Sequence, residues 1–368
     1  MAKIYTITCH EVYNHGASLQ EYALLSHLNA MGHEASTLHY KPHYLQGAGN
    51  LYVINPRFDL PVLRSIYFWM KRKERRLKKQ RIAAFDAFAQ KYIPTHPTLY
   101  TNNDQLQANV PQADAYICGS DQIWNSFFEN GKDPAFYLAF APDHKRKIAY
   151  AASFAIDEIA AELKGFVRDN IKRLDAVGVR ETSGVQIVKD LGIENAQQVL
   201  DPTFLLTADH YISNFVKEET GEYVFVYDFD NNPIIRAIAL SLKKKYNWKI
   251  KTVNPNLDYA DEIYWTTGPE KFLSLINSSQ YVLSNSFHAL AFSLIFNKQV
   301  AIINRADKIN TRMRDLLALL NLSTYLISSV DDFNKLSPID YSEVNPLLEK
   351  HIERSKLFLS QSLSNLTS

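Results

Sequence analysis

The sequence of 368 residues has few of the residues that build covalent or metal-bound frameworks. Its two cysteines, Cys9 and Cys118, each follow an apolar run, as small buried residues near strand ends do. Two cysteines cannot form a disulfide framework or a cysteine-based metal cluster. HExxH and CxxC motifs are also absent, which removes the usual sequence signatures of metalloproteases and zinc ribbons. We therefore expect neither a metal site nor a cofactor.

Motifs that bind nucleotides or activate a serine are missing as well. GxGxxG, the P-loop pattern and GxSxG do not occur, so dinucleotide-binding, kinase-type and serine-hydrolase interpretations lose their main support. The formal net charge of +1 argues against a nucleic-acid partner bound over the whole surface.

Long hydrophobic runs are lacking too, and no apolar stretch has the length needed to span a bilayer as a helix. The first residues lead directly into a predicted strand near residues 3–8, without the pattern of a signal peptide. A reducing cytoplasm is therefore the compartment that we expect, with peripheral contact at the inner face of the membrane left open.

What the sequence does contain is a regular alternation of strand-like and helix-like runs. A first series of strands is predicted near residues 3–8, 34–40, 113–118, 147–152, 176–179 and 197–200. A second series is predicted near residues 223–228, 248–253, 262–265, 280–283, 299–303 and 324–327. Such alternation is typical of α/β proteins with parallel sheets covered by helices.

Two series of similar length predict two Rossmann-like domains, residues 1–206 and 207–368, with a polar stretch near 207–221 at their boundary. A final helix near 341–363 is expected to pack back on the first domain. Ligands of open parallel sheets bind at the carboxyl ends of the strands, so the cleft between the domains is the expected site.

One region interrupts the alternation, because residues 61–92 read as one long helix inserted in the first domain. Its segment 71–81 carries eight basic residues and one acidic residue, directly after an apolar and aromatic run at 66–70. Residues 66–81 can rest on an anionic membrane surface or hold a lipid pyrophosphate. The alternative is a solvated helix whose apolar face packs on its own domain.

Two strand-to-helix junctions of the first series carry polar side chains. In the junction at residues 13–20, Gly16 permits close approach of the backbone. In the junction at residues 118–125, Asp121 can orient or deprotonate a sugar hydroxyl, and Trp124 can stack on a sugar ring. The alternative is a turn in which Asp121 caps a helix and Trp124 belongs to the core.

Two further junctions favour an anionic ligand. Arg180 follows the predicted strand at 176–179, where a guanidinium offers a planar fork to a carboxylate or phosphate, or pairs with a nearby acid. The turn at Asn285 and Ser286 opens a helix whose first amides attract anions. His288 lies in the first turn of that helix, where it can hold or donate a proton, or remain a solvated side chain.

At these four junctions the chain resembles the polysaccharide pyruvyl transferase family, over residues 4–320. The matching segments are 14–20 (NHGASLQ), 119–125 (GSDQIWN), 150–154 (YAASF), 179–181 (VRE), 200–203 (LDPT) and 284–288 (SNSFH). The resemblance implies a GT-B-like fold and transfer of a pyruvyl group from phosphoenolpyruvate to a sugar as a cyclic ketal. The acceptor would be a cell-surface polysaccharide or its lipid-linked oligosaccharide precursor.

The resemblance also implies roles for individual residues. Arg180 and His288 would meet phosphoenolpyruvate, the co-substrate, with Arg312 as a further contact. His288 would act as proton donor and Asp121 would assist the attacking hydroxyl. Beside these, the expected donor-binding residues are Asn285 and Ser286, and the expected acceptor-binding residues are Asn14, His15, Gly16, Ser120, Trp124 and Asn125. Ala289 departs from the family, in which a glycine often follows the histidine.

Two other functions fit the same plan. A nucleotide-sugar glycosyltransferase of GT-B type would need a contact to a ribose, for which Asp228 and Asp230 are candidates. A non-catalytic relative that binds glycans would keep the fold and lose the chemistry. The oligomeric state cannot be predicted from the sequence.

Overall fold

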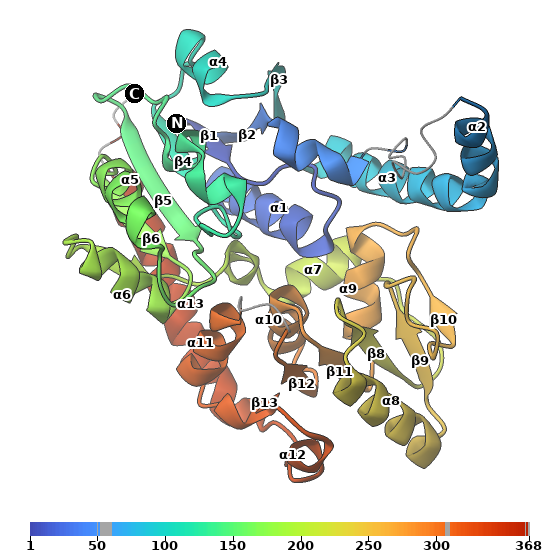
Figure 1. The fold of residues 1–368 in the computed structure, drawn as a ribbon. Helices are drawn as coiled ribbons and strands as arrows, with labels where there is room; N and C mark the ends of the chain where they lie inside the picture. Colours follow the sequence, from blue (N-terminus) through green and yellow to red (C-terminus); the bar gives the residue numbers. More distant parts are fainter. Residues whose placement is uncertain (50, 52–60, 306–309, 365, 367–368) are drawn as a thin grey trace.

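The computed structural model describes residues 1–49, 51, 61–305, 310–364 and 366, and within them it contains two parallel β-sheets covered by helices (Figure 1). The first sheet has seven strands in the order β3-β2-β1-β4-β5-β6-β7. These are β1 (Lys3–Ile7), β2 (Glu34–Tyr40), β3 (Thr95–Tyr100), β4 (Ala115–Cys118), β5 (Arg146–Ala152), β6 (Ala176–Val179) and β7 (Ala196–Gln198). The predicted α/β class is confirmed.

The second sheet has six strands in the order β10-β9-β8-β11-β12-β13. Its strands are β8 (Tyr223–Tyr227), β9 (Lys249–Thr252), β10 (Glu262–Ile263), β11 (Tyr281–Ser284), β12 (Val300–Ile303) and β13 (Leu326–Ile327). Every residue of the central strand β8 is buried. Strands covered on both faces read as continuous apolar runs, and this is why the sequence predicts them well.

The helices alternate with the strands in both halves. They are α1 (His15–Ala30), α2 (Pro61–Met70), α3 (Arg72–Tyr92), α4 (Asn103–Ala108), α5 (Ala161–Ile171), α6 (Thr182–Asp190), α7 (Ala208–Phe215), α8 (Pro233–Tyr246), α9 (Pro269–Asn277), α10 (Phe287–Ile295), α11 (Thr311–Leu319), α12 (Val330–Asn334) and α13 (Tyr341–Leu363). Short 3-10 turns are η1 (His43–Gly49), η3 (Glu129–Lys132), η4 (Pro134–Tyr137), η5 (Pro202–Leu205) and η6 (Ser323–Tyr325). None of these described helices is both long and apolar enough to cross a membrane.

The basic insertion consists of two helices, which differs from the single helix expected over 61–92. Lys71 separates α2 from α3 with a φ of −85° and a ψ of 7°. The Arg75 guanidinium donates a hydrogen bond to the carbonyl of Phe68 at 2.7 Å, across this break. At the break α2 turns away from the outer end of α3 and projects from the body (Figure 1).

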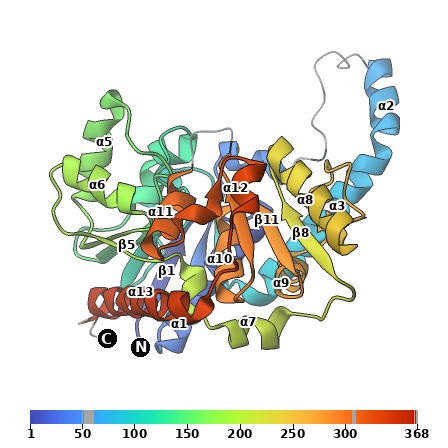
Figure 2. The same ribbon diagram turned by 90° about the horizontal axis from the view of Figure 1, so that it is seen from below.

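One hydrophobic core runs beneath both sheets. It joins Leu24 of α1, Phe272 of α9, Phe292 of α10 and Leu359 of α13 with the inner faces of strands from both halves. Helix α13 lies across the underside of the first half and contacts β5 (Figure 2). Ser355 of α13 accepts a hydrogen bond from the backbone nitrogen of Leu200 at 2.9 Å. One apolar cluster therefore packs the two halves together beneath the carboxyl ends of their sheets, and we call it the apolar base.

Candidate active site

A buried ion pair lies at the centre of the site. Arg180, directly after β6, places Nη1 2.5 Å from Oδ2 of Asp201, and the two side chains are 1% and 0% exposed. The other oxygen of Asp201 accepts bonds from the backbone nitrogen and the hydroxyl of Thr203, at 3.0 and 2.9 Å. Asp201 thus opens η5 and fixes the guanidinium at the same time. Sequence reasoning gave Asp201 no role, although it lies within the matching segment 200–203.

The histidine turn of the second sheet reaches the same carboxylate. His288, in the first turn of α10, holds Nε2 3.6 Å from Oδ2 of Asp201, and its side chain is 7% exposed. This distance exceeds that of a hydrogen bond, and Nε2 has no hydrogen-bond partner within the described parts of the chain. The structure therefore brings Arg180 and His288, predicted from opposite halves, onto one oxygen atom.

Gly16 is the reason that the imidazole fits in this place. A Cβ atom built on Gly16 would lie 2.0 Å from Nδ1 of His288, which no real side chain permits. Asn14 caps helix α1 immediately before it, since its Oδ1 accepts bonds from the backbone nitrogens of Gly16 and Ala17 at 3.0 and 3.2 Å. The N-terminus of α1 is thus packed against the catalytic candidate itself.

A second carboxylate lies between two guanidinium groups. Oδ1 of Asp121 is 3.4 Å from Nη2 of Arg180 and also 3.4 Å from Nη1 of Arg312 in α11. Both guanidinium groups flank the ring of Phe287, at 4.5 Å for Arg180 and 5.8 Å for Arg312. Asp121 is 18% exposed and is the part of this group that reaches the surface most.

Opposite charges within the group keep its buried side chains ionised. Burial opposes ionisation of Asp121, but Arg180, His288 and Arg312 outweigh it and hold the pKa of this carboxyl below its usual range. The pKa of Asp201 is likewise lowered, because the nearby imidazole of His288 and the charge of Arg180 outweigh burial. Burial, followed by the like charge of Arg180, lowers the pKa of Arg312 to about 10. Both carboxylates and both guanidinium groups are therefore ionised at neutral pH.

Several buried polar atoms in this group lack partners within the described residues. They include Nε of Arg180, Nε of Arg312 and Nε2 of His288. Buried polar atoms in folded proteins are nearly always paired, so these three nitrogen atoms keep hydrogen-bonding capacity that an anionic ligand can use. Glu181, next to Arg180, accepts bonds from Ser153 and the backbone nitrogen of Ala155, and burial raises its pKa.

Several residues expected to contact an acceptor serve inside the frame instead. Trp124 is fully buried, donates its Nε1 proton to the Phe136 carbonyl at 3.0 Å and stacks on Tyr137, so the expected stacking on a sugar is corrected to a core role. Ser120 is also fully buried, and its hydroxyl lies 3.2 Å from Oδ2 of Asp201, where it supports the ion pair.

Two further acceptor candidates, His15 and Asn125, are equally closed to solvent. His15 is fully buried and its ring stacks on Phe272 at 5.0 Å, so burial lowers its pKa well below the ordinary value. Asn125 is fully buried and bonds to Gln122 at 2.9 Å. Direct contact between these side chains and an acceptor is therefore corrected as well, whereas their packing explains why the junctions keep their shape.

On the second sheet, the turn before α10 ties two strand ends together. Asn285 donates to Oδ1 of Asp228 at 2.7 Å and accepts from the backbone nitrogen of Phe229 at 3.0 Å, which leaves it 1% exposed. The backbone nitrogen of Ser286 donates to the hydroxyl of Ser284 at 3.0 Å. Asn285 therefore holds the strand ends in place. Its side chain is engaged there and makes no hydrogen bond to Arg180, Asp201, Asp121, Arg312 or His288, which we call the histidine group.

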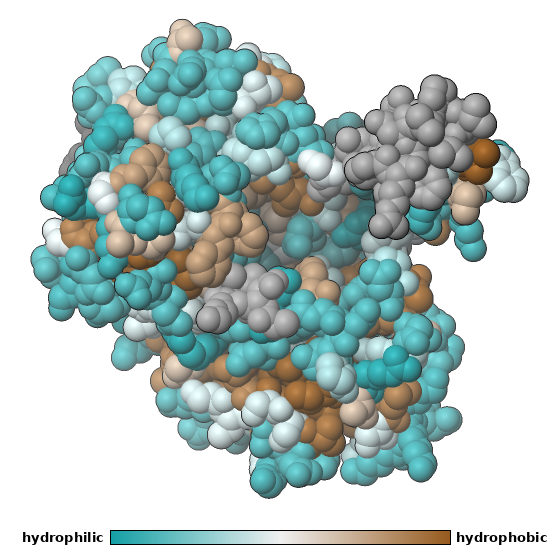
Figure 3. Space-filling model, in the orientation of Figure 1, coloured by the Kyte–Doolittle hydropathy of each residue, from teal (hydrophilic) through white to brown (hydrophobic). Residues whose placement is uncertain are grey.

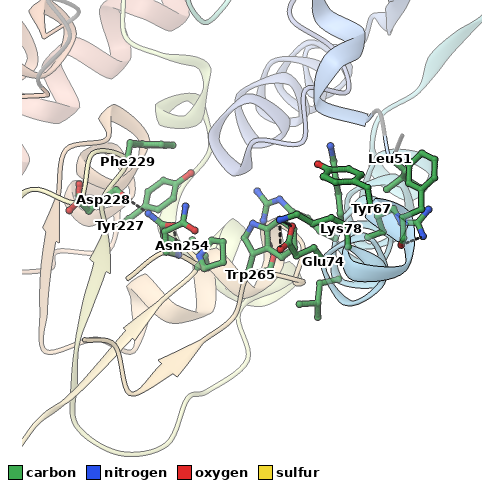
Figure 4. A pocket seen from close by; sticks show the side chains of 17 residues that line it. Leu51, Tyr67, Glu74, Lys78, Tyr227, Asp228, Phe229, Asn254 and Trp265 are labelled. Carbon is green, nitrogen blue, oxygen red and sulfur yellow. Dashed lines mark hydrogen bonds and ion pairs between the residues drawn. The ribbon is translucent and has the colours of Figure 1, made fainter. Parts of the chain in front are cut away.

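A large cavity lies between α3 and the carboxyl ends of β8 and β9, and Asp228, the partner of Asn285, is one of its lining residues (Figures 3 and 4). Its volume is about 750 Å³. Its lining residues are Leu51, Tyr67, Phe68, Lys71, Glu74, Arg75, Leu77, Lys78, Arg81, Tyr227, Asp228, Phe229, Val253, Asn254, Pro255, Asn256 and Trp265. Basic side chains of α3 thus face aromatic side chains of the second half.

Arg81 connects the two walls of this cavity. Its guanidinium donates to the carbonyl of Trp265 at 2.8 Å and to the carbonyl of Tyr13 at 2.9 Å. Tyr13 precedes α1 and Trp265 follows β10, so one side chain of α3 joins loops from both halves. The basic character of segment 71–81 is plain from the sequence, but its position opposite the second sheet is not.

Two parallel α/β sheets whose carboxyl ends meet at a shared site define a protein of GT-B-like fold. The UDP-GlcNAc 2-epimerase from Neisseria meningitidis bound to UDP-GlcNAc is similar over 98% of this chain and 99% of its own, with 12% identity and a TM-score of 0.51. A UDP-N-acetylglucosamine 2-epimerase from Rickettsia bellii also aligns, with 13% identity over 99% of each chain and a TM-score of 0.44. An alpha-glucosyltransferase in complex with UDP aligns with 10% identity over 98% of this chain and 96% of its own, with a TM-score of 0.45. At such identities the likeness concerns the fold.

The sequence itself assigns the family. The family model described as polysaccharide pyruvyl transferase matches residues 14–307. The chain therefore belongs to the polysaccharide pyruvyl transferase family, as the resemblance predicted. The comparison with curated proteins found no significant match.

Proposed function

We propose that this protein transfers a pyruvyl group from phosphoenolpyruvate to two hydroxyl groups of one sugar and closes a cyclic ketal. The observation that carries this proposal is the meeting of Arg180, Arg312 and His288 around unpaired buried donors. A donor with both a carboxylate and a phosphate needs several cationic groups at fixed positions. Membership of the family supports the same conclusion.

The contacts of Asp121 suggest how the donor enters. Its two separations of 3.4 Å from guanidinium nitrogens are longer than charge-assisted hydrogen bonds, which measure about 2.7–2.9 Å. An incoming dianion can therefore take these guanidinium groups from Asp121 more easily than from Asp201, which Arg180 holds at 2.5 Å. Asp121 is then released toward the open side, where it can accept a proton from a sugar hydroxyl.

The proposed reaction balances with these groups. Protonated His288 gives its proton to the methylene carbon of phosphoenolpyruvate, and the cationic centre at the neighbouring carbon is attacked by the first hydroxyl, which loses its proton to Asp121. Phosphate departs with the bonding electrons, and the second hydroxyl attacks the same carbon and closes the ring. The proton of the second hydroxyl leaves with the phosphate. Arg180 and Arg312 stabilise the charge of the departing phosphate.

The basic and aromatic cavity supports an acceptor that carries phosphate. Lys78 and Arg75 of α3 line one wall, together with Lys71 just before this helix, and Trp265 and Phe229 line the opposite wall. Guanidinium and ammonium groups suit a pyrophosphate linkage, while aromatic rings suit the apolar faces of sugars. We propose that a lipid-linked oligosaccharide occupies this cavity with its sugar end toward the histidine group.

The end of α2 supports contact with a membrane. Ile66, Trp69 and Met70 are 49%, 75% and 65% exposed, at the spacing of one helix face. Figure 3 shows apolar colour at this projecting end of the molecule. An exposed aromatic and aliphatic face beside the basic helix α3 is the pattern of a surface that lies on anionic lipid.

The nucleotide-sugar alternative loses one of its two ribose candidates, Asp228, while Asp230 remains. Asp228 is fully buried, and its carboxylate accepts bonds from the backbone nitrogens of Asp230 and Asn232 at 2.9 and 2.7 Å and from the amide of Asn285. All of these contacts are internal to the loop and its neighbour. Thermal stabilisation by UDP or GDP, and none by phosphoenolpyruvate, would restore this alternative.

The direct test mixes the full-length protein with phosphoenolpyruvate and a panel of free and lipid-linked glycans. Phosphate release that requires the glycan, together with a new ketal methyl signal in the NMR spectrum of the product, is the expected result. His288→Ala should abolish turnover, and His144→Ala, at an exposed histidine, should not. Absence of both turnover and phosphoenolpyruvate binding contradicts the proposal and leaves a glycan-binding relative as the better explanation.

A further inference from the structure

Two histidines and a glutamate lie close together where β1 ends beside its neighbour β2. His10 and Glu11 follow β1, and His39 belongs to β2. Nitrogen atoms of His10 and His39 and a carboxylate oxygen of Glu11 all lie within 4.8 Å of one another. We propose that these three side chains bind a divalent transition metal ion of the Zn²⁺ type. This inference does not depend on the pyruvyl transfer proposed above.

The sheet brings these residues together. β1 and β2 are parallel, with Tyr5 opposite Ser36 and Thr6 opposite Thr37, so the segment after β1 runs beside His39 near the end of β2. His39 lies far from His10 in sequence, and no short motif links them. The sequence, which lacks HExxH and CxxC, therefore gave no sign of a metal site here.

The separations suit a metal better than a hydrogen bond. Nε2 of His10 is 3.6 Å from Oε1 of Glu11, and Nε2 of His39 is 3.9 Å from Oε2 of the same carboxylate. Ligand bonds of about 2.0–2.2 Å in a tetrahedral zinc site place neighbouring ligand atoms about 3.3 Å apart. The two histidine–glutamate separations are close to this value, and the three ligand atoms, which lie within 4.8 Å of one another, would have to draw together around the ion.

A buried carboxylate already fixes the first ligand. Nδ1 of His10 lies 2.9 Å from Oε1 of Glu21, and these side chains are 2% and 3% exposed. A carboxylate on the far nitrogen of a histidine is the usual support of a metal ligand, because it fixes the ring and its tautomer. It leaves Nε2 of His10 directed at Glu11. The rings of His10 and His39 stand edge to face, 5.6 Å apart.

The ammonium group of Lys41 pairs with one of the proposed ligands in this structure. Its Nζ lies 2.6 Å from Oε2 of Glu11. A metal ion has to displace this contact before both oxygens of Glu11 become available. Lys41 is therefore a competitor, and its removal should tighten metal binding, whereas loss of a ligand should weaken it.

The chemistry of the ligands selects the ion. Two imidazoles and one carboxylate suit Zn²⁺ and its neighbours among the transition metals, and leave a fourth position for water. Mg²⁺ and Ca²⁺ prefer oxygen ligands and should not compete. A metal here would fix the loop between β1 and α1, which leads to Asn14 and Gly16.

The test is calorimetric titration of the metal-stripped full-length protein with Zn²⁺. We expect one site in the wild type, loss of that site in His39→Ala, and weakening by roughly 10–100-fold in Glu21→Gln. Lys41→Met should bind more tightly than the wild type. His144→Ala is the matched control at an exposed histidine and should retain the site. Co²⁺ should give visible absorption bands that vanish in His39→Ala.

His39 is a suitable position because its side chain is 27% exposed, so its replacement disturbs little packing. Circular dichroism checks that the variant is folded. Wild-type affinity in folded His39→Ala overturns the proposal. Failure of both the wild type and Lys41→Met to bind Zn²⁺ overturns it as well, even if the other variants are unstable.

Discussion

The imidazole of His288 lies directly on Gly16, where an added Cβ would be 2.0 Å from its Nδ1. A residue of the first half thus determines where the imidazole of the second half can lie. Because this contact involves backbone and a buried ring, neither partner can shift without changing the site. The first prediction follows from this contact.

Gly16→Ala should displace the ring of His288 from Asp201 and lower turnover by roughly 10²-fold, the usual effect of a misplaced catalytic group. Phosphate release in the presence of acceptor measures it. Gly165→Ala is the matched control, because an added Cβ at Gly165 meets nothing within 4 Å. Equal activity of both variants would show that the position of His288 does not control the reaction.

Asp201→Asn should destabilise the fold, because it leaves the buried guanidinium of Arg180 without its 2.5 Å partner. Breaking one partner of a buried pair costs about 3–5 kcal/mol of unfolding free energy. Asp258→Asn breaks the exposed pair with Arg236 and should cost about 0–1 kcal/mol. Urea denaturation measures both, and similar values for the two variants contradict the prediction.

The free energy of unfolding should depend on the ionisation of Asp201 at acidic pH. The pKa of Asp201 is lower in the folded protein than its ordinary value of about 3.9, so ionised Asp201 stabilises the fold above that value. This stabilisation is lost as the pH falls from about 4 toward the lowered pKa. Unfolding free energies measured at stepwise lower pH should therefore drop more steeply for the wild type than for Asp201→Asn. Parallel curves contradict the assignment.

Asp121→Asn should separate binding from turnover. Removal of its charge frees Arg180 and Arg312 for the anionic donor, so phosphoenolpyruvate should bind more tightly in calorimetry. Loss of the proton acceptor should at the same time lower kcat by roughly 10²–10⁴-fold. Asp169→Asn, at an exposed side chain, should change neither quantity. Weaker donor binding in Asp121→Asn would contradict the proposed exchange of partners.

Replacement of Trp69 and Met70 by serine should weaken association with vesicles that contain anionic lipid, because these side chains are 75% and 65% exposed on α2. Co-sedimentation measures the bound fraction, and activity on a water-soluble acceptor should remain. Ile212→Ser removes an apolar side chain of α7 that is 40% exposed and is the control. Unchanged sedimentation of the double variant excludes α2 as a membrane contact.

The sequence predicted the sheets well where burial leaves a clear pattern. β8 is buried along its whole length, and its apolar run was read as a strand. β3 escaped prediction because it is an edge strand with mostly exposed residues, so its sequence THPTLY shows neither an apolar run nor a regular alternation. The break at Lys71 was also missed, since the helical pattern continues through it.

The site was predictable where a residue type matches a strand end, as for Arg180 and His288. It was not predictable where packing decides, because an indole after a strand can equally stack on a sugar or, like Trp124, fill the core. The role of Asp201 depends on contacts with residues far away in sequence. Distances of this kind become visible only when the two sheets are placed together.

The apolar base beneath both sheets has a consequence for how substrates come and go. Leu24, Phe272 and Phe292 belong to one core, and Arg81 ties loops of both halves above it. Hinged separation of the halves would expose that core to water and break the contact of Arg81 with the carbonyl of Trp265. We therefore expect substrate entry and product release to use local movements near the site, with the two halves staying packed on each other.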